Sequence, residues 1–273
     1  MEKKKIETQY QKKIKLLLKY NEYYFDKSVP IIEDSKYDQL KKEILNLEQK
    51  YKFLVKDKSV SNLVGFKPSK NFKKVVHKTP MLSLANAFDQ DDLHNFEKRI
   101  LNYLDENREF QIEYSAEPKI DGISASLIYK NGKFVTGLSR GDGKEGEDIT
   151  ENLKTIKDIP AQIIAKNFPD EIDIRGEVFI QNSDFKKFSE KFANPRNAAS
   201  GSLRQKYPEE TKKIPLKFIA YTFGYERGLK ISTQNEFLKQ LKDWGFKTNS
   251  LNKTLKGIEN LVKNYNEIEK KKR

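Results

Sequence analysis

The sequence has 273 residues, of which 53 are Lys or Arg and 40 are Asp or Glu, so its formal net charge is +13 at pH 7. The absence of cysteine excludes a disulfide scaffold, a thiolate metal site and a cysteine nucleophile. The positive charge fits a polyanionic partner such as nucleic acid, but it fits equally well lysines that are spread over the whole surface.

No stretch of the sequence approaches the roughly 18 apolar residues that a membrane-spanning helix requires. The basic N-terminal segment also lacks the apolar centre of a secretory signal. We therefore expect a cytoplasmic protein that does not contact a membrane, and we expect it to be a monomer.

The first 70 or so residues predict helices. In the second of these helices Ser35 and Asp38 have the spacing of a capping box at its start. Apolar side chains then recur at helical spacing, at Tyr37, Leu40, Ile44 and Leu47.

A polar stretch containing Gly65 and Pro68 predicts a boundary near residue 70. After this boundary another helix is expected to begin at Asp89. Its apolar side chains fall on one face, at Leu93, Phe96, Ile100 and Leu104.

Beyond residue 110 the pattern changes to strands. Residues 123–140 form two predicted strands around Asn131-Gly132, a strong signal for a two-residue hairpin turn. Further strands are expected at 171–180 and 214–225, and helices at 182–192 and at 232–245, where Gly245 ends the helix. Helices followed by mixed strands and helices predict an α+β fold and not a regular βαβ repeat.

The most informative motif is E-P-K-I-D-G at residues 117–122, directly before a predicted strand. A lysine amine attacks phosphorus only in its neutral form, and its reference pKa of about 10.4 means that the site must disfavour the ammonium. A bound divalent cation or neighbouring basic side chains would have that effect. Lys119 is therefore a candidate nucleophile.

Two further motifs follow in the same half of the chain. S-R-G-D-G at residues 139–143 places Arg140, a possible clamp for phosphate or ribose, in a glycine turn that lets backbone approach a ligand. R-G-E at residues 175–177 places Glu177 on a strand, where it could bind ribose hydroxyls or a metal ion. Each motif alone is weak evidence, whereas the three in this order at strand edges are a specific pattern. A phosphate loop of the G-x-x-x-x-G-K-[ST] type is absent.

The three motifs together resemble those of the covalent nucleotidyltransferases, which comprise DNA ligases, RNA ligases and capping enzymes. The longer resemblance is to bacterial NAD-dependent DNA ligases, and it extends over about residues 10–273. It rests on F-A-N-P-R-N-A-A-S-G-S-L-R-Q at 192–205, on H-K-T-P-M-L-S-L-A-N-A-F at 77–88 and on the segment 23–40.

The resemblance implies a helical cap at residues 1–70 that binds the nicotinamide mononucleotide (NMN) half of NAD. It implies a nucleotidyltransferase (adenylation) domain, ATP-grasp-like with mixed antiparallel sheets, at residues 71–273. Lys119 would attack the α-phosphate of NAD, with Mg²⁺ as cofactor, and Asp121 would help to set the charge state of the lysine. Contacts to the adenosine half are implied for Ser83, Leu84, Glu117, Arg140 and Glu177, and contacts to the NMN half for Tyr24, Asp34, Tyr37 and Asp38.

Two departures from the family pattern are visible. Phe25 stands where the family usually has His or Tyr, which removes a polar contact worth roughly 1 kcal/mol. The family's I-D-G-V-V-x-K segment, its later lysine segment and its zinc module do not occur before Arg273. We therefore expect a shortened adenylation region that contains no zinc, adenylates itself poorly and does not seal nicked duplex DNA by itself.

Other interpretations remain open at this point. The chain could be related to ATP-dependent ligases or capping enzymes, which share the lysine chemistry but have no use for an NMN pocket. It could also be a catalytically impaired ligase fragment that only binds NAD or nucleic acid. Binding of the latter kind would depend strongly on salt.

Overall fold

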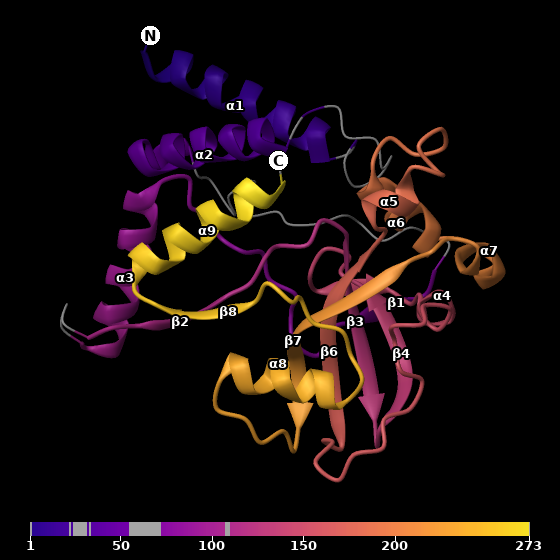
Figure 1. The fold of residues 1–273 in the computed structure, drawn as a ribbon. Helices are drawn as coiled ribbons and strands as arrows, with labels where there is room; N and C mark the ends of the chain where they lie inside the picture. The colour runs from indigo at the N-terminus through magenta and orange to yellow at the C-terminus, as the bar shows by residue number, and fades with distance from the viewer. Residues whose placement is uncertain are drawn as a thin grey trace.

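The computed structural model describes residues 2–21, 23, 32, 34–54, 72–106 and 110–272 (Figure 1). A helical region precedes a larger region of antiparallel sheets and helices, so the predicted α+β class is confirmed. No helix within these ranges is long and apolar enough to cross a membrane.

The helical region consists of α1 (Glu2–Asn21), α2 (Asp34–Lys50) and a short 3-10 helix, η2 (Lys52–Leu54). The spacing predicted for α2 is confirmed, because Leu40 and Ile44 are buried while Tyr37 and Leu47 pack around them. The predicted start is wrong, because Ser35 is the second residue of α2 and not its cap. This region has its own apolar cluster, made by Tyr10, Ile14, Leu17, Leu40, Ile44 and Leu54.

The main sheet has the strand order β4-β3-β6-β7, and all neighbouring strands are antiparallel. The predicted hairpin is confirmed, because Asn131 and Gly132 have φ angles of 48° and 75° and connect β3 to β4. The four strands are β3 (Ile123–Lys130), β4 (Lys133–Ser139), β6 (Glu171–Phe179) and β7 (Lys217–Arg227).

Two small sheets extend this architecture. β1 (Lys74–Val76) pairs with β5 (Glu145–Glu147), and β2 (Glu113–Ala116) pairs with β8 (Lys253–Lys256). In Figure 1, α3 and α9 lie next to the β2-β8 pair, and α8 lies beside the main sheet. The helices of this part are α3 (Gln90–Leu104), α4 (Thr150–Leu153), α5 (Asn182–Phe185), α6 (Pro195–Leu203), α7 (Pro208–Lys212), α8 (Gln234–Asp243) and α9 (Ile258–Lys272).

The predicted helix ends agree with the structure at α3 and α8. Asp89 caps α3 by accepting a hydrogen bond from the backbone N–H of Asp92. Thr233 and Glu236 form a capping box at the start of α8. Phe96, from the predicted apolar face of α3, is nevertheless exposed, and the helix expected at 182–192 is reduced to the single turn α5.

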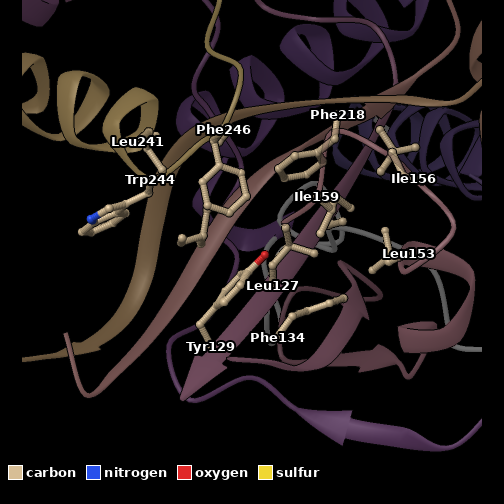
Figure 2. Packing of buried hydrophobic residues seen from close by; sticks show 14 of the residues in the cluster. Leu127, Tyr129, Phe134, Leu153, Ile156, Ile159, Phe218, Leu241, Trp244 and Phe246 are labelled. Carbon is tan, nitrogen blue, oxygen red and sulfur yellow. The ribbon is translucent and has the colours of Figure 1, made fainter. Parts of the chain in front are cut away.

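Tyr129 lies at the centre of the larger core, on the face of β3 that packs against helices and loops. Its ring contacts Phe134 and Phe246, with centroids 5.4 and 5.8 Å away, and Figure 2 shows these side chains together. The hydroxyl donates a 2.6 Å hydrogen bond to the backbone carbonyl of Pro160. Burial raises the pKa of Tyr129, so the hydroxyl remains a donor.

We expect Tyr129→Phe to lower the free energy of unfolding by about 1–2 kcal/mol, because the carbonyl of Pro160 loses the donor of a part-buried hydrogen bond. Urea denaturation measures the change. Tyr265→Phe is the matched control, since Tyr265 is 65% exposed, and it should leave the midpoint unchanged. Equal midpoints for the two variants would show that the Tyr129 hydroxyl contributes nothing.

Candidate active site

The Lys119 turn, residues 117–122, connects β2 to β3 and lies directly against β6. A Cβ atom built on Gly122 would be 2.3 Å from the carbonyl oxygen of Val178 and 2.9 Å from Cγ of Glu177. Glycine is therefore required at this position by close approach of the two backbones. Lys119 itself is exposed, so its amine is accessible to a ligand.

Glu177 is the buried carboxylate beside this turn. It is 7% exposed, and Ser124 Oγ donates a 3.0 Å hydrogen bond to Glu177 Oε2. Burial raises the pKa of Glu177 to about 7, although Ser124 and the charges of Arg196 and Lys119 act in the opposite direction. The influence of the Lys119 charge on this carboxylate indicates that the lysine lies near Glu177.

The signature at 192–205 contributes Arg196 to the same site. Arg196 lies in the first turn of α6, and its Nη1 is 3.3 Å from Asp121 Oδ1. The sequence analysis assigned no role to Arg196, although its position inside a specific signature was a usable signal. This ion pair attaches the Lys119 turn, through Asp121, to α6.

The glycine turn at residues 139–143 carries Arg140, whose charge is close to Glu177. Gly141 and Gly143 have φ angles of 58° and 91°, which glycine adopts without strain. Asp142 Oδ1 accepts 2.8 Å hydrogen bonds from the backbone N–H groups of Lys144 and Glu145. This carboxylate therefore stabilises the turn.

Arg140 joins this turn to the segment that precedes α3. Its Nη2 donates a 2.9 Å hydrogen bond to Ser83 Oγ, and its Nε lies 3.4 Å from the carbonyl of Met81. Burial lowers the pKa of the Arg140 guanidinium, and nearby Tyr221 and Glu177 partly offset that effect. Two residues predicted for the adenosine half, Ser83 and Arg140, are therefore in contact, and Leu84 follows with 77% of its surface exposed.

Glu117 is oriented by residues that the sequence analysis did not identify. Gln234, the first residue of α8, donates to Glu117 Oε1 at 2.8 Å and to the carbonyl of Tyr221 at 2.6 Å. Ser115 Oγ donates to the same carboxylate oxygen at 3.0 Å. Burial and the charge of Glu177 raise the pKa of Tyr221 to about 12, so its hydroxyl is neutral at physiological pH.

Three of the residues predicted for the NMN half, Asp34, Tyr37 and Asp38, belong to α2. The hydroxyl of Tyr37 donates a 2.7 Å hydrogen bond to Asn21 Oδ1, and burial together with the charge of Asp38 raises the pKa of Tyr37. Asp34 is the first residue of α2. Tyr24 and Phe25 lie outside the described residues, as does the boundary predicted near residue 70.

An α+β fold with antiparallel sheets, in which a K-x-D-G lysine lies beside a buried glutamate and an arginine turn, defines a nucleotidyltransferase domain. Residues 69–273 match the family described as NAD-dependent DNA ligase adenylation domain. Residues 3–65 match the family described as DNA ligase-like, N-terminal NAD⁺-binding domain. The chain belongs to the NAD-dependent DNA ligase family.

Relatives with the name DNA ligase cover nearly the whole chain. The protein from Pelagibacter ubique is 62% identical over 273 residues, which are 100% of this chain and 40% of that protein. The protein from Parvibaculum lavamentivorans is 45% identical over 262 residues, which are 93% of this chain and 37% of that protein. The chain therefore spans about two fifths of the length of these relatives.

The raised pKa of Glu177 predicts how stability changes with pH. Its pKa is 4.5 in a model peptide and about 7 in the folded chain, so between these values the folded state binds more protons than the unfolded state. The free energy of unfolding should therefore decrease as pH rises from about 4.5 to 7, by about 1–3 kcal/mol.

Glu177→Gln cannot titrate and should lack this contribution. Urea denaturation of both proteins across this pH range gives the difference in unfolding free energy at each pH. Curves that run parallel for the wild-type and variant proteins would contradict the burial-driven shift.

Proposed function

We propose that the chain catalyses the first step of NAD-dependent DNA ligation, the transfer of AMP from NAD to Lys119. The observation that carries this proposal is the position of an exposed lysine on a turn packed against the buried Glu177, with Asp121 and two arginines around it. Family membership supports the same reaction.

In this step the neutral amine of Lys119 attacks the α-phosphorus of NAD. A nitrogen–phosphorus bond forms, and the bond from this phosphorus to the bridging oxygen breaks. NMN leaves with the electron pair of that bond. The nitrogen, which becomes positively charged when it bonds to phosphorus, releases one proton to solvent. The product is a lysine–AMP phosphoramidate. The guanidinium of Arg140 suits the charge that develops on the phosphoryl oxygens.

The residues around Lys119 fit an adenosine monophosphate group. Exposed Leu84 offers an apolar surface for adenine, and Ser83 is fixed beside it by Arg140. The hydrogen bonds that Glu117 accepts from Ser115 and Gln234 both go to Oε1, so among the described residues Oε2 is left to accept from a ligand. Glu177 would accept hydrogen bonds from the ribose hydroxyls.

The NMN half would bind to the helical cap, residues 1–70, through Tyr24, Asp34, Tyr37 and Asp38. The nicotinamide ring of NAD is cationic, and such a ring is attracted by aromatic faces and carboxylates. The adenylation domain, residues 71–273, would hold the other half. The match of residues 3–65 to an N-terminal NAD⁺-binding domain supports this division.

Mg²⁺ fits this site as a metal carried largely by the substrate. Among the described residues no group of three or more His, Asp or Glu side chains could hold a metal ion. Mg²⁺ typically uses one or two carboxylates together with phosphate oxygens and water, and Asp121 and Glu177 offer such carboxylates. When bound, the ion would neutralise charge on the phosphates.

The complete protein would use the adenylated lysine to activate the 5′-phosphate at a nick in duplex DNA. The net charge of +13 suits such a polyanionic substrate. We expect this protein to act as a monomer in the cytoplasm, in DNA replication and repair.

Incubation with NAD labelled in its adenylate phosphate should attach label to the wild-type chain, and Lys119→Ala should reduce the labelling at least about 100-fold. Gel electrophoresis followed by autoradiography measures the covalent product, and acid should release it as expected for a phosphoramidate. Lys154→Ala is the control, because Lys154 is a surface residue paired with Glu151. Undiminished label on Lys119→Ala would exclude the proposed nucleophile.

Recognition of the NMN half should depend on α2. We expect Asp38→Asn to weaken NMN binding about tenfold, because the carboxylate that faces a cationic ring is lost. Isothermal titration with NMN and AMP separately would detect the change, and AMP affinity should be unaffected.

ATP labelled in its α-phosphate should not modify the wild-type chain. Efficient labelling by ATP would favour an ATP-dependent relative instead.

A further inference from the structure

Residues 77–83, the segment that carries Ser83, follow β1 and are not part of a strand. Its backbone is attached to the glycine turn by two hydrogen bonds, from the N–H of His77 to the carbonyl of Lys144 and from the N–H of Met81 to the carbonyl of Gly143, both 2.8 Å long. These bonds leave the carbonyls between them to be held by another part of the molecule.

Arg175, in the middle of β6, holds those carbonyls. Its Nη1 donates a 3.1 Å hydrogen bond to the carbonyl of Pro80, and its Nη2 donates a 2.5 Å hydrogen bond to the carbonyl of Thr79. The side chain is buried, and the proposed catalytic step does not use it. It therefore connects the cofactor-site segment to the central sheet.

A second layer fixes the guanidinium of Arg175. Its Nε and Nη2 donate to Asp173 Oδ2 at 3.0 and 2.9 Å, and the hydroxyl of Ser126 donates to Asp173 Oδ1 at 2.5 Å. Alternation along the strand places Asp173 and Arg175 on the same face of β6 as Glu177. The opposite face packs into the core through Ile172, Ile174 and Val178.

Gly224 in β7 provides the space for this ion pair. A Cβ atom at this position would lie 2.2 Å from Arg175 Nη2 and 2.2 Å from Asp173 Oδ2. The φ angle of Gly224 is outside the left-handed region, so backbone conformation does not require glycine here. Glycine is required at residue 224 because Arg175 and Asp173 occupy the space that a side chain would need.

Stability does not account for this arrangement. A buried ion pair gains little over apolar side chains of similar volume, because desolvation of both charges offsets their attraction. The guanidinium fork of Arg175 is planar and is itself held by the Asp173 carboxylate. It therefore restricts the positions of the two carbonyls more closely than apolar packing would.

We propose that Arg175 is a positioning residue for the adenosine half of the cofactor site. It fixes the carbonyls of Thr79 and Pro80, and thereby keeps Ser83 in hydrogen-bonding distance of Arg140. It touches neither the cofactor nor Lys119, and it acts entirely through the segment 79–83. This role rests on the proposed function, because it assumes that Ser83 and Arg140 contact AMP.

The test compares AMP and NMN as separate probes of the two half-sites. Gly224→Ala displaces the fork without removing a charge, and Arg175→Lys keeps the charge but loses the fork. Both should weaken AMP binding about tenfold or more and raise the KM for NAD in self-adenylation, while NMN affinity changes less than about twofold. Calorimetry and single-turnover labelling provide these values.

Arg227→Lys is the matched control on the neighbouring strand β7, since Arg227 forms an exposed ion pair with Asp170 at 3.6 Å. The double variant Asp173→Leu with Arg175→Met removes the buried charges together, so it should retain a cooperative thermal transition. It should nevertheless lose AMP affinity as the single variants do.

The outcomes separate the two proposals. A wild-type chain that binds AMP, with variants that bind it equally well, overturns the positioning role alone. Equal losses of AMP and NMN affinity in the folded double variant overturn it as well, because they indicate a general structural effect. A wild-type chain that neither binds AMP nor becomes labelled overturns both the proposed function and this inference.

Discussion

The site depends on the antiparallel pairing of β3 with its two neighbours. Ser124 at the start of β3 is opposite Glu177 on β6, and Ala125 is opposite Ser139 at the end of β4. In an antiparallel sheet the start of one strand lies beside the ends of its neighbours. The Lys119 turn, the arginine turn and Glu177 are therefore gathered at one end of the sheet, and Gly122 permits the closest of these approaches.

Much of this convergence could be predicted from local sequence. The Asn131-Gly132 turn fixes the register next to it, where Lys130 is opposite Lys133. An irregularity between Ile128 and Tyr129, for which the sequence contains no signal, then shifts the pairing by one residue and places Ser139 opposite Ala125. The start of α3 at Asp89 is equally local, since its cap depends on a residue three positions away. Structural features that depend on residues within a few positions of one another, such as turns and helix caps, were predicted correctly in most cases.

The unpredicted parts of the site come from contacts between distant segments. Arg196 reaches Asp121 from 75 residues away, and Gln234 reaches Glu117 from 117 residues away. The sequence contains no local signal for such pairs, because they depend on how α6 and α8 pack on the sheet. The prediction that Phe96 belongs to a buried face of α3 was wrong for the same reason. Periodicity identifies an apolar face of a helix, but tertiary packing decides whether Phe96 on that face is covered.

The two regions have separate apolar cores, and under the proposed function NAD would connect them. The helical region packs around Ile44, whereas the sheet region packs around Tyr129, and the two clusters share no residue. The contacts from α2 toward α3 include a 3.7 Å ion pair from Lys42 to Asp92 and the same lysine 4.4 Å above the ring of Phe88. Exposed contacts of this kind contribute at most about 1 kcal/mol each.

A dinucleotide that places one half in each region would add its own binding energy to these weak contacts. Binding the second half becomes an intramolecular event once the first half is bound, so its effective concentration is high. The same linkage is broken by the proposed chemistry, because AMP stays on Lys119 and NMN becomes a separate molecule. After the reaction no dinucleotide would bridge the two regions, which favours release of NMN and opens the adenylated lysine to the next substrate.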